Sequence, residues 1–391
     1  MHSLKSRLEA REAKSLDSSL FLLMAGIAAV GMQALVLSPL LTDIAAGLSA
    51  GPREIGFASG AYGAGVALMA LLAAPRLGHW PKRTAIRCAF AILAAGLVLC
   101  AFVWDWRVLV VGQLIAGLAS GIIIPGTYAL TADITPAPMR SRAIGRVLFG
   151  WSIALVGGVP IAAALADLVD WRTTLVIIAA LAAAMTVAIG LLPKATSQVA
   201  QRVSYGEALA TPGIVIGLAA TFAYMIGFYQ TYTFIGDHVR HLHGSGAWLP
   251  GLIAGSYGLG FGAAMVFDGW IDRVGSRKLM AFTLFLVGVN YLVLPLAMLN
   301  IWSVVLYPFL WGVGNHLCMT VLVSFMGSAP TERRGTVMGL FSCTTYVAHA
   351  LGGGLYGSIY AANGFAAVSI AATGTLFLAA LAVAIFLPRQ A

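Results

Sequence analysis

The stretch 268–278, which reads Asp-Gly-Trp-Ile-Asp-Arg-Val-Gly-Ser-Arg-Lys, gathers charge in a chain of which only 9% of the residues are charged. It follows an apolar run that contains Gly-Ser-Tyr-Gly-Leu-Gly at 255–260. A similar run, Gly-Ala-Tyr-Gly-Ala-Gly, lies 195 residues earlier at 60–65, and it also precedes a basic turn, at 76–83. Two apolar segments that each end in a cationic turn predict a membrane protein built by duplication.

The composition agrees with a location in the membrane. Of the 391 residues 60% are hydrophobic, and the mean hydropathy is +0.91. Apolar stretches of about 20 residues, the length of one membrane crossing, recur along the chain. Residues 1–17 are polar and precede a long apolar run without a small-residue cleavage site, so we expect an uncleaved first span. The expected fold class is an all-α polytopic membrane protein with twelve transmembrane helices, at 18–47, 54–77, 84–104, 107–131, 142–166, 172–193, 211–238, 247–269, 278–299, 301–327, 336–361 and 363–387.

The 23 lysines and arginines are divided unequally between the two sides of the membrane. Twelve spans place both termini on one side, which then holds 19 of these residues, against four on the other: Arg53, Arg107, Arg172 and Arg240. Loops rich in lysine and arginine stay in the cytoplasm. We therefore expect a multi-pass protein of the cytoplasmic (inner) membrane, embedded in the lipid bilayer, with both termini cytoplasmic. Topology explains the net charge of +9, so nucleic acid is not an expected partner.

The duplication extends beyond the two glycine-tyrosine runs. One proline, one arginine and two glycines recur at an offset of 194 residues: Pro136/Pro330, Arg140/Arg334, Gly145/Gly339 and Gly158/Gly352. Parallel repeats of this kind are related by an axis along the membrane normal. The predicted division is a cytoplasmic segment at 1–17, six-helix bundles at 18–193 and 211–391, and a cytoplasmic linker at 194–210. Ser204 and Glu207 in the linker have the spacing of a capping box, which predicts a short interfacial helix.

These residues resemble the major facilitator superfamily over nearly the whole chain. The segment Asp272-Arg273-Val-Gly275-Ser-Arg277-Lys278 is similar to that family's signature loop between the second and third spans of a half. Gly145-Arg146 followed by Gly157-Gly158-Val159-Pro160 is similar to the span-five motif of drug:proton antiporters, and Asp170-Trp171-Arg172 resembles the arabinose- and purine-efflux-like members. The resemblance implies the major facilitator fold, with two halves that rock around a central site. It also favours export of a small organic solute in exchange for protons.

Three features depart from the family pattern. The first signature loop has Leu77 or Gly78 where the family carries an acid, and span four has Gln113 where such exporters usually carry an arginine. Proton-coupled members often bury a carboxylate in span one or four, whereas the 14 acidic residues here lie in loops or at span ends. Two alternatives therefore stay open. One is an uncoupled facilitator or importer of a small neutral solute, and the other is a non-transporting sensor or assembly protein on the same fold.

The resemblance also indicates where the substrate binds, because spans one, four, seven and ten line the cavity in family members. The expected substrate-binding residues are the polar and aromatic ones near the middle of these spans: Gln33, Gln113, Tyr224, Tyr229, Gln230, Asn315 and His316. None of them carries a fixed charge, which suits a neutral or weakly amphipathic solute. The alternative is that the amides bond neighbouring helices and that the aromatic face of span seven serves packing.

Three residues are candidates for proton coupling. His316 comes first, because imidazole titrates near neutral pH and a histidine about 14 residues into a span is costly without a function. Asp133 closes span four, and His349 lies at a similar depth in span eleven. Span eleven usually supports the cavity in the family, so a structural role is the alternative for His349.

Two motifs are expected to control the conformational change. At the cytoplasmic face the signature-loop residues Asp272, Arg273, Gly275 and Arg277 are predicted to form a latch, in which Asp272 pairs with an arginine while that side is shut. In span five, Gly157, Gly158 and Pro160 are predicted to pack against the glycines of span eight and to seal the outer side, as this motif does in the family. The alternatives are topology alone for the loop and general small-residue packing for the glycines.

The sequence offers no constellation for catalysis. His238, His241 and His243 cluster with Asp237 after span seven, and we expect a solvated loop there rather than a metal site. The four cysteines lie in apolar runs without metal-ligand spacing, and the chain has no phosphate-binding loop. We therefore expect a non-enzymatic monomer that takes a small-molecule substrate, uses the proton as its coupling ion, and needs no metal or cofactor.

Overall fold

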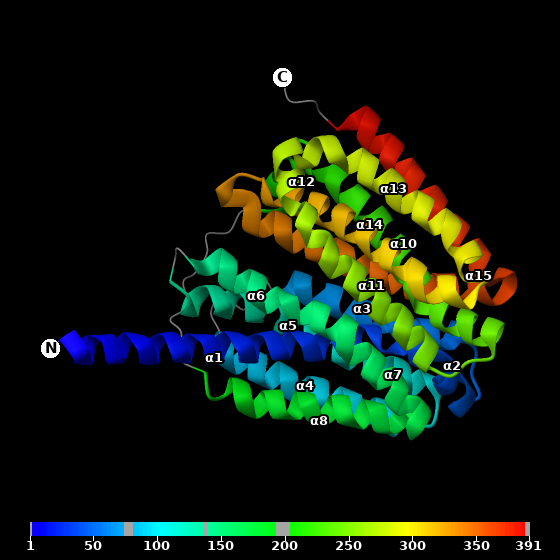
Figure 1. Ribbon diagram of the computed structural model, residues 1–391, viewed down its shortest axis with the longest axis horizontal. Helices are drawn as coiled ribbons and strands as arrows, with labels where there is room; N and C mark the ends of the chain where they lie inside the picture. The colour runs from blue at the N-terminus through cyan, green and yellow to red at the C-terminus, as the bar shows by residue number, and fades with distance from the viewer. Residues whose placement is uncertain (1, 74–80, 137–138, 193–203, 388–391) are drawn as a thin grey trace.

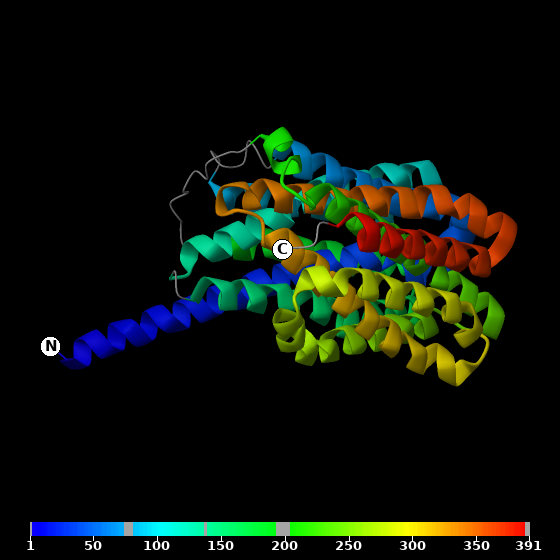
Figure 2. The same ribbon diagram turned by 90° about the horizontal axis from the view of Figure 1, so that it is seen from above.

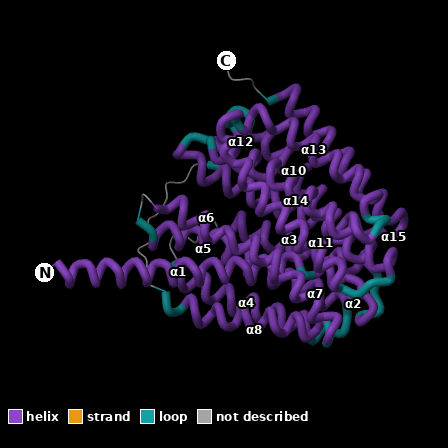
Figure 3. Tube along the Cα trace, in the orientation of Figure 1, coloured by secondary structure: helices purple, strands orange, loops and turns teal. Residues whose placement is uncertain are grey.

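The computed structural model describes residues 2–73, 81–136, 139–192 and 204–387. Throughout these ranges the chain is helical, with short connecting loops and no strand (Figures 1 and 3). The predicted all-α fold class is therefore confirmed. Leu77 and Gly78 of the first signature loop, and residues 194–203 of the predicted linker, lie outside the described residues.

The first half of the chain forms one helical bundle. Its helices are α1 (His2–Leu35), α2 (Leu37–Gly47), α3 (Pro52–Ala73), α4 (Lys82–Ala101), α5 (Trp106–Ile134), α6 (Arg140–Ile153), α7 (Val159–Leu168) and α8 (Trp171–Ile189). The predicted first span is broken at Val36, between α1 and α2. The predicted fifth span contains a π-helical turn, Ala154–Gly158, between α6 and α7. Pro160 has no N–H for the carbonyl of Val156, which accounts for an irregular turn at this point.

The second half forms the other bundle. Its elements are α9 (Tyr205–Leu209), α10 (Ile214–His243), α11 (Trp248–Ala263), a 3-10 turn at Ala264–Phe267, α12 (Asp268–Val274), α13 (Ser276–Ala297), α14 (Ile301–Gly327) and α15 (Thr331–Phe386). Ser204 caps α9 by accepting a hydrogen bond from the Glu207 N–H at 3.2 Å. The capped helix predicted in this part of the linker is therefore present.

Helix α15 contains two membrane crossings. A straight helix of its 56 residues would be about 84 Å long, whereas the hydrocarbon core of a bilayer is about 30 Å thick. Gly364 divides it, with a φ of 75° that only glycine adopts readily. Eleven helices in the described residues are long and apolar enough to cross a membrane, and α15 counts twice. The structure thus has the twelve crossings that the sequence predicts.

Each bundle has its own buried core and an apolar outer surface. Phe90 is fully buried in the first bundle, and Trp311 and Tyr291 are fully buried in the second. On the outside, Leu168 and Leu191 are each 82% exposed, and many other large apolar side chains are exposed as well. Exposure on this scale would be unfavourable in water and is favourable against lipid. The chain is a multi-pass membrane protein.

The main contacts between the bundles involve α15, α11 and α10 of the second half. Helix α3 packs against α15, α11 packs against α7 and the π-helical turn, and α10 packs against α2 (Figures 1 and 2). We call the face at which α3 ends and α4 begins the terminal face, because α1 also begins there. The opposite face, with the α2–α3 and α10–α11 turns, is the distal face. The α2–α10 contact lies at the distal face.

Candidate functional site

His316 in α14 contacts a carboxylate from the eighth span. Its Nε2 lies 2.8 Å from Asp268 Oδ1 and 3.2 Å from Thr320 Oγ1, and the edge of the Phe261 ring meets the imidazole. The 3-10 turn at Ala264–Phe267 ends α11, and Asp268 begins α12, so its side chain points back toward α14. The His316 side chain is 6% exposed and that of Asp268 is 41% exposed. The pair joins a buried imidazole to a partly exposed acid.

Asp268 was not among the predicted site residues. In the sequence it stands out only as part of the charged stretch at the end of span eight. The signal that points to it is its position four residues before Asp272, which places it one helical turn deeper in the span. Its partner comes from another helix, and the sequence does not give that pairing.

An aromatic cluster fills the centre of the second bundle beside His316. The rings of Phe228, Tyr232, Tyr257, Tyr291 and Trp311 pack against one another, with centroids 4.8–6.5 Å apart. Several buried polar atoms in and beside this cluster have no hydrogen bond of good geometry to a described residue: both amide atoms of Asn315, the Trp311 Nε1 and the hydroxyls of Tyr232 and Tyr291. The Asn315 amide nevertheless lies near the hydroxyls of Tyr257 and Tyr291, and the Trp311 indole lies near Tyr291. Buried polar groups with poorly formed hydrogen bonds are costly, so a ligand that offers better partners gains from binding here.

Other predicted substrate residues are engaged with neighbouring helices. The Tyr224 hydroxyl donates a hydrogen bond to the Asn315 carbonyl at 3.0 Å, which links α10 to α14. Gln33 Nε2 donates to Gln113 Oε1 at 2.9 Å, which links α1 to α5. Gln230 Nε2 donates to the Val368 carbonyl at 3.0 Å, which links α10 to the second part of α15. Helix packing, the alternative given above, accounts for both glutamine contacts, and the substrate role of these residues stays a prediction.

His349 and Tyr229 lie together where the two bundles meet. Their rings are stacked, with centroids 3.8 Å apart and planes 3° from parallel. His349 Nε2 lies 3.2 Å from Ser59 Oγ, and the imidazole is tilted against the ring of Tyr62; both partners belong to α3 of the other bundle. His349 Nδ1 is buried without a hydrogen bond among the described residues. This histidine therefore bridges the bundles.

The glycines of α3 allow its backbone to approach α15. A Cβ atom added to Gly60 would lie 2.6 Å from the Ala350 carbonyl oxygen and 2.8 Å from the Gly354 nitrogen. At Gly63 it would lie 2.8 Å from the Cβ of His349. Real Cβ atoms do not come this close, so this contact requires glycine.

The span-five motif meets span eight mainly through Pro160. A Cβ added to Gly255 of α11 would lie 3.2 Å from Pro160 Cγ. Gly158 instead faces α1, because a Cβ there would lie 2.5 Å from Met32 Cγ, and Gly157 has nothing within 4 Å. Pro160 thus contacts span eight, whereas Gly158 packs against α1 and Gly157 contacts neither helix. Their role in sealing the outer side stays a prediction.

The charged stretch forms the turn between α12 and α13. Gly275 has a φ of 95°, and Arg277 lies over the Phe325 ring, 5.5 Å from its centroid. Asp272 and Arg273 are exposed, and Asp272 forms no ion pair with a described residue. At the same face Asp133 pairs with Lys82 at 2.5 Å. The ion pair of Asp272 that the predicted latch requires is therefore not formed with any described residue, and the role of the latch stays a prediction.

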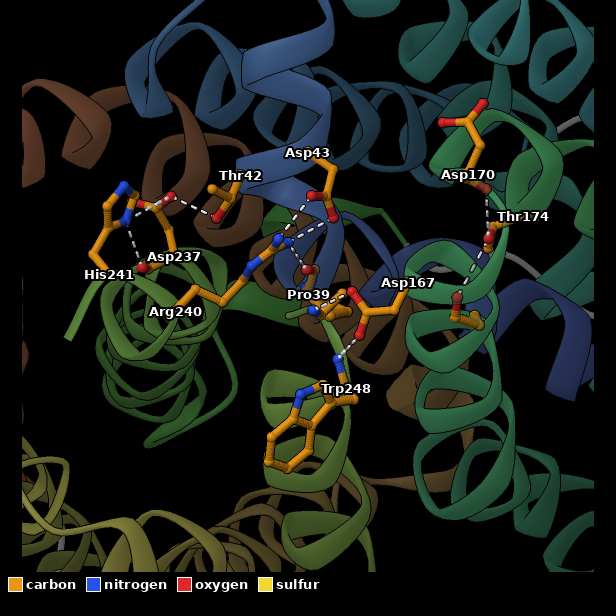
Figure 4. Close-up of polar contacts among 12 residues, drawn as sticks. Pro39, Thr42, Asp43, Asp167, Asp170, Thr174, Asp237, Arg240, His241 and Trp248 are labelled. Carbon is orange, nitrogen blue, oxygen red and sulfur yellow. Dashed lines mark hydrogen bonds and ion pairs between the residues drawn. The ribbon is translucent and has the colours of Figure 1, made fainter. Parts of the chain in front are cut away.

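The histidine cluster after span seven is not a solvated loop, so that prediction was wrong. Helix α10 continues to His243, and Asp237 is 3% exposed. Asp237 accepts hydrogen bonds from Thr42 Oγ1 at 2.8 Å and from the Tyr360 hydroxyl at 2.7 Å. One turn further along α10, Arg240 pairs with Asp43 of α2 (Figure 4). Sequence analysis does not find these contacts because their partners are far apart in the chain. Thr42 and Asp43 are almost 200 residues from their partners, and Tyr360 is 123 residues from Asp237.

Comparison with known proteins gives the family. The model of the Major Facilitator Superfamily matches residues 22–252 and 217–391. An uncharacterized MFS-type transporter of Bacillus subtilis is 28% identical over 354 residues, covering 88% of this chain and 86% of the relative. Probable sugar efflux transporters are also similar: that of Helicobacter pylori strain G27 is 25% identical, covering 82% of each chain, and that of Haemophilus influenzae strain KW20 is 26% identical, covering 70% of each. The chain is a membrane transporter that belongs to the Major Facilitator Superfamily.

Proposed function

We propose that this transporter exports a small neutral, polyhydroxylated solute from the cytoplasm in exchange for protons. The observation that carries the proposal is that His316, paired with Asp268, follows Asn315 on α14, and that the Asn315 amide is buried without a hydrogen bond of good geometry to a described residue. A titratable pair next to a group with free hydrogen-bonding capacity gives proton and solute one shared region. Occupation of that region by one of them then disfavours the other, as exchange requires.

The chemistry of the aromatic cluster supports the substrate class. Aromatic rings offer flat apolar faces, and the Asn315 amide, the Trp311 indole N–H and the Tyr232 hydroxyl offer donors and acceptors. The cluster contains no charged side chain, so it suits a neutral solute with several hydroxyl groups. The names of the relatives in Helicobacter pylori and Haemophilus influenzae, probable sugar efflux transporters, agree with this class.

The His316–Asp268 pair supports proton coupling. The buried imidazole releases its proton toward the cytoplasm through Asp268, whose side chain is 41% exposed at the end of span eight. A protonated His316 forms a charge-assisted hydrogen bond with the carboxylate, and loss of the proton removes that interaction. In the exchange cycle, His316 loses its proton toward the cytoplasm when solute binds, and it takes up a new proton after the solute has left.

The positive-inside distribution supports the orientation. In this proposal the terminal face is cytoplasmic, the protein lies as a monomer in the cytoplasmic membrane, and the bundles of residues 18–193 and 211–391 rock against each other. Asp272, Arg273, Gly275 and Arg277 then form the cytoplasmic latch when that side closes. Asp133 and His349 remain further candidates for the proton path, and the arabinose- and purine-efflux-like group is the proposed subgroup.

The test uses purified protein in liposomes with an imposed pH gradient and a panel of radiolabelled neutral sugars. Solute flux and internal pH are recorded together. We expect His316→Gln and Asp268→Asn each to lower pH-driven flux by about tenfold or more, because each removes one member of the titratable pair. His243→Gln is the matched control, since His243 lies at the distal end of α10 and bonds the Met298 carbonyl. It should transport like the unmodified protein.

The remaining outcomes identify the alternatives. Solute movement without proton movement, unchanged in His316→Gln, would contradict exchange and select an uncoupled facilitator or importer. The missing acid of the first signature loop and Gln113 in span four favour that alternative. Sugar binding without any flux would select a sensor or assembly protein.

A further inference from the structure

One face of α2 is matched to one face of α10 at the distal face of the molecule. On α2, Ser38 and Thr42 are one helical turn apart, and Asp43 follows Thr42. The Ser38 hydroxyl donates a hydrogen bond to the Tyr232 carbonyl of α10. A Cβ added to Gly236 would lie 2.5 Å from the Ser38 carbonyl oxygen, so the two backbones are in direct contact here. This close approach brings the next polar side chains of the two helices together.

The outermost contact is an ion pair between the bundles. Both terminal nitrogens of Arg240 donate to Asp43, with Nη1–Oδ2 and Nη2–Oδ1 distances of 2.6 and 2.7 Å (Figure 4). The Arg240 side chain is 11% exposed and that of Asp43 is 30% exposed. A bidentate, largely buried pair is more strongly bound than a surface pair with mobile side chains. It is also a pair that is lost completely if the two helices move apart.

A second polar layer lies directly beneath this pair. Asp237 is nearly fully buried, and its two carboxylate oxygens accept hydrogen bonds from Thr42 of the first bundle and Tyr360 of the second. The Nδ1 atom of His241 lies 3.4 Å from the same carboxylate. Asp237 keeps Tyr360 and His241 when the bundles separate but loses Thr42.

The contact lies on the axis that relates the two halves. Thr42 and Asp237 are 195 residues apart, which is the offset between the two glycine-tyrosine runs. Ser38 and Tyr232 are 194 residues apart, so Ser38 meets the residue next to its repeat equivalent, Thr233. Residues at equivalent repeat positions meet only where the pseudo-twofold axis passes between them. Contacts at this place join the two bundles symmetrically.

A third carboxylate joins the bundles beside the contacts between α2 and α10. Asp167, at the end of α7, accepts hydrogen bonds from the backbone N–H groups of Ala247 and Trp248, at 2.7 and 2.6 Å (Figure 4). These N–H groups begin α11 of the other bundle, so one bundle caps a helix of the other. Separation of the bundles would leave that helix start without its cap.

We propose that Asp43–Arg240, Thr42–Asp237 and the Asp167 cap together form the gate that closes the distal face. Other ion pairs, such as Lys82–Asp133 and His316–Asp268, each lie within one bundle and do not resist opening. The gate must break for the distal face to open, and it must form again for the terminal face to admit solute. The inference does not depend on the identity of the solute or of the coupling ion.

The test is a distance measurement across the gate in nanodiscs, by pulsed electron spin resonance. Spin labels are placed at Ala46→Cys on α2 and Leu242→Cys on α10, two exposed positions near the distal ends of these helices, in a Cys88→Ser background. We expect a short distance to dominate in the otherwise unmodified protein. Asp43→Asn and Arg240→Gln should each raise the long-distance population by about tenfold, and Asp43→Arg combined with Arg240→Asp should restore the short distance.

Arg172→Gln is the matched control. Arg172 also lies at the distal face, but it donates to the carbonyls of Ala101 and Val103 within its own bundle. Its replacement should leave the distance distribution unchanged. An unchanged distribution in both Asp43→Asn and Arg240→Gln would overturn the proposal, and so would an equal shift in Arg172→Gln. If the charge exchange did not restore the short distance, the Asp43–Arg240 ion pair would not be what holds the gate closed.

Discussion

The α3–α15 contact and the contact of α11 with α7 and the π-helical turn are two versions of one interface. Gly60 and Gly255 occupy equivalent positions in the two halves, at an offset of 195 residues. Their partners are also equivalent, because Ala350 and Gly354 correspond to Val156 and Pro160 at an offset of 194. In both interfaces the glycine faces those two partners. Duplication therefore produced one packing arrangement on each side of the axis.

The two interfaces have nevertheless diverged in how closely they pack at this pair of glycines. At Gly60 an added Cβ would strike backbone atoms of α15 at 2.6 and 2.8 Å, whereas at Gly255 it would meet the Pro160 ring at 3.2 Å. The α3–α15 interface is thus backbone against backbone. The other interface is filled by a proline side chain and contains an irregular π-helical turn. The comparison teaches that the contact at Gly60 is tighter than its equivalent at Gly255. At the next equivalent pair, Gly63 and Gly258, an added Cβ would lie 2.7 Å from the nearest partner atom in both interfaces.

They have also diverged in polarity. His349 occupies the position of Leu155, and Ser59, which bonds His349, occupies the position of Ala254. The α3–α15 interface therefore has a buried polar bridge where its counterpart is apolar. A difference of this kind between equivalent sites points to a specific role for the polar one, since packing alone is satisfied by leucine and alanine.

The strongest way to break the comparison is to add one methyl group to each interface. We expect Gly60→Ala to lower transport by about tenfold or more, because its Cβ can be accommodated only if α3 moves away from α15. Gly255→Ala should retain transport within about twofold, because the Pro160 ring needs to shift by only a few tenths of an ångström. Flux into liposomes measures both.

The spin-label distance across α2 and α10 separates this effect from misfolding. Gly60→Ala should favour the long distance while the protein remains monodisperse in detergent. Equal loss of transport in the two alanine variants would mean that the interfaces are equally tight, which contradicts the comparison.

A second experiment transplants the polar bridge to the apolar interface. Leu155→His should lower the free energy of unfolding by about 2–3 kcal/mol, because the imidazole is buried without a partner. Adding Ala254→Ser should recover about 1 kcal/mol, the usual net value of one hydrogen bond. Denaturant unfolding in detergent micelles measures both changes. No recovery with the added serine would show that the bridge depends on more than the Ser59–His349 contact, and the stacked Tyr229 would be the first residue to examine.

The sequence predicts the architecture well because hydropathy and charge report directly on the membrane. Twelve crossings, the duplication and the capped helix at Tyr205–Leu209 all follow from local patterns. The breaks at Val36, Ala154–Gly158 and Ala264–Phe267 do not, because an irregular turn leaves the hydropathy of a span unchanged. These breaks nevertheless shape the site, since the last of them brings Asp268 to His316.

The candidate site is less accessible to sequence analysis, for a related reason. His316 and Asn315 stand out because polar residues in a span are costly. Asp268, Asp43 and Arg240 lie near span ends, where charge is expected and carries no special signal. Their importance comes from partners on other helices, and Asp237 shows that even a residue predicted to be solvated is buried when its helix continues.

The smallest expected effects concern how the two equivalent helices begin. The start of α3 is capped within its own bundle, where the Gly51 N–H donates to Glu54 Oε2 at 2.9 Å, whereas the start of α11 is capped by Asp167 of the other bundle. Glu54→Gln keeps an acceptor oxygen and loses only a charge near the helix start, so the free energy of unfolding should fall by about 0.3–1 kcal/mol. The spin-label distance should stay the same.

Asp167→Asn should change the spin-label distance rather than the free energy of unfolding. Each oxygen of the Asp167 carboxylate serves a different N–H group, so an amide in the same position keeps one acceptor and turns its NH₂ group toward the other N–H. Because that cap joins the bundles, its weakening should raise the long-distance population by about two- to threefold with little change in the unfolding of either bundle. The same nanodisc measurement compares the two variants. A distance shift in Glu54→Gln as large as in Asp167→Asn would mean that any weakened helix start loosens the distal face, and that capping across the bundles has no special part in holding it shut.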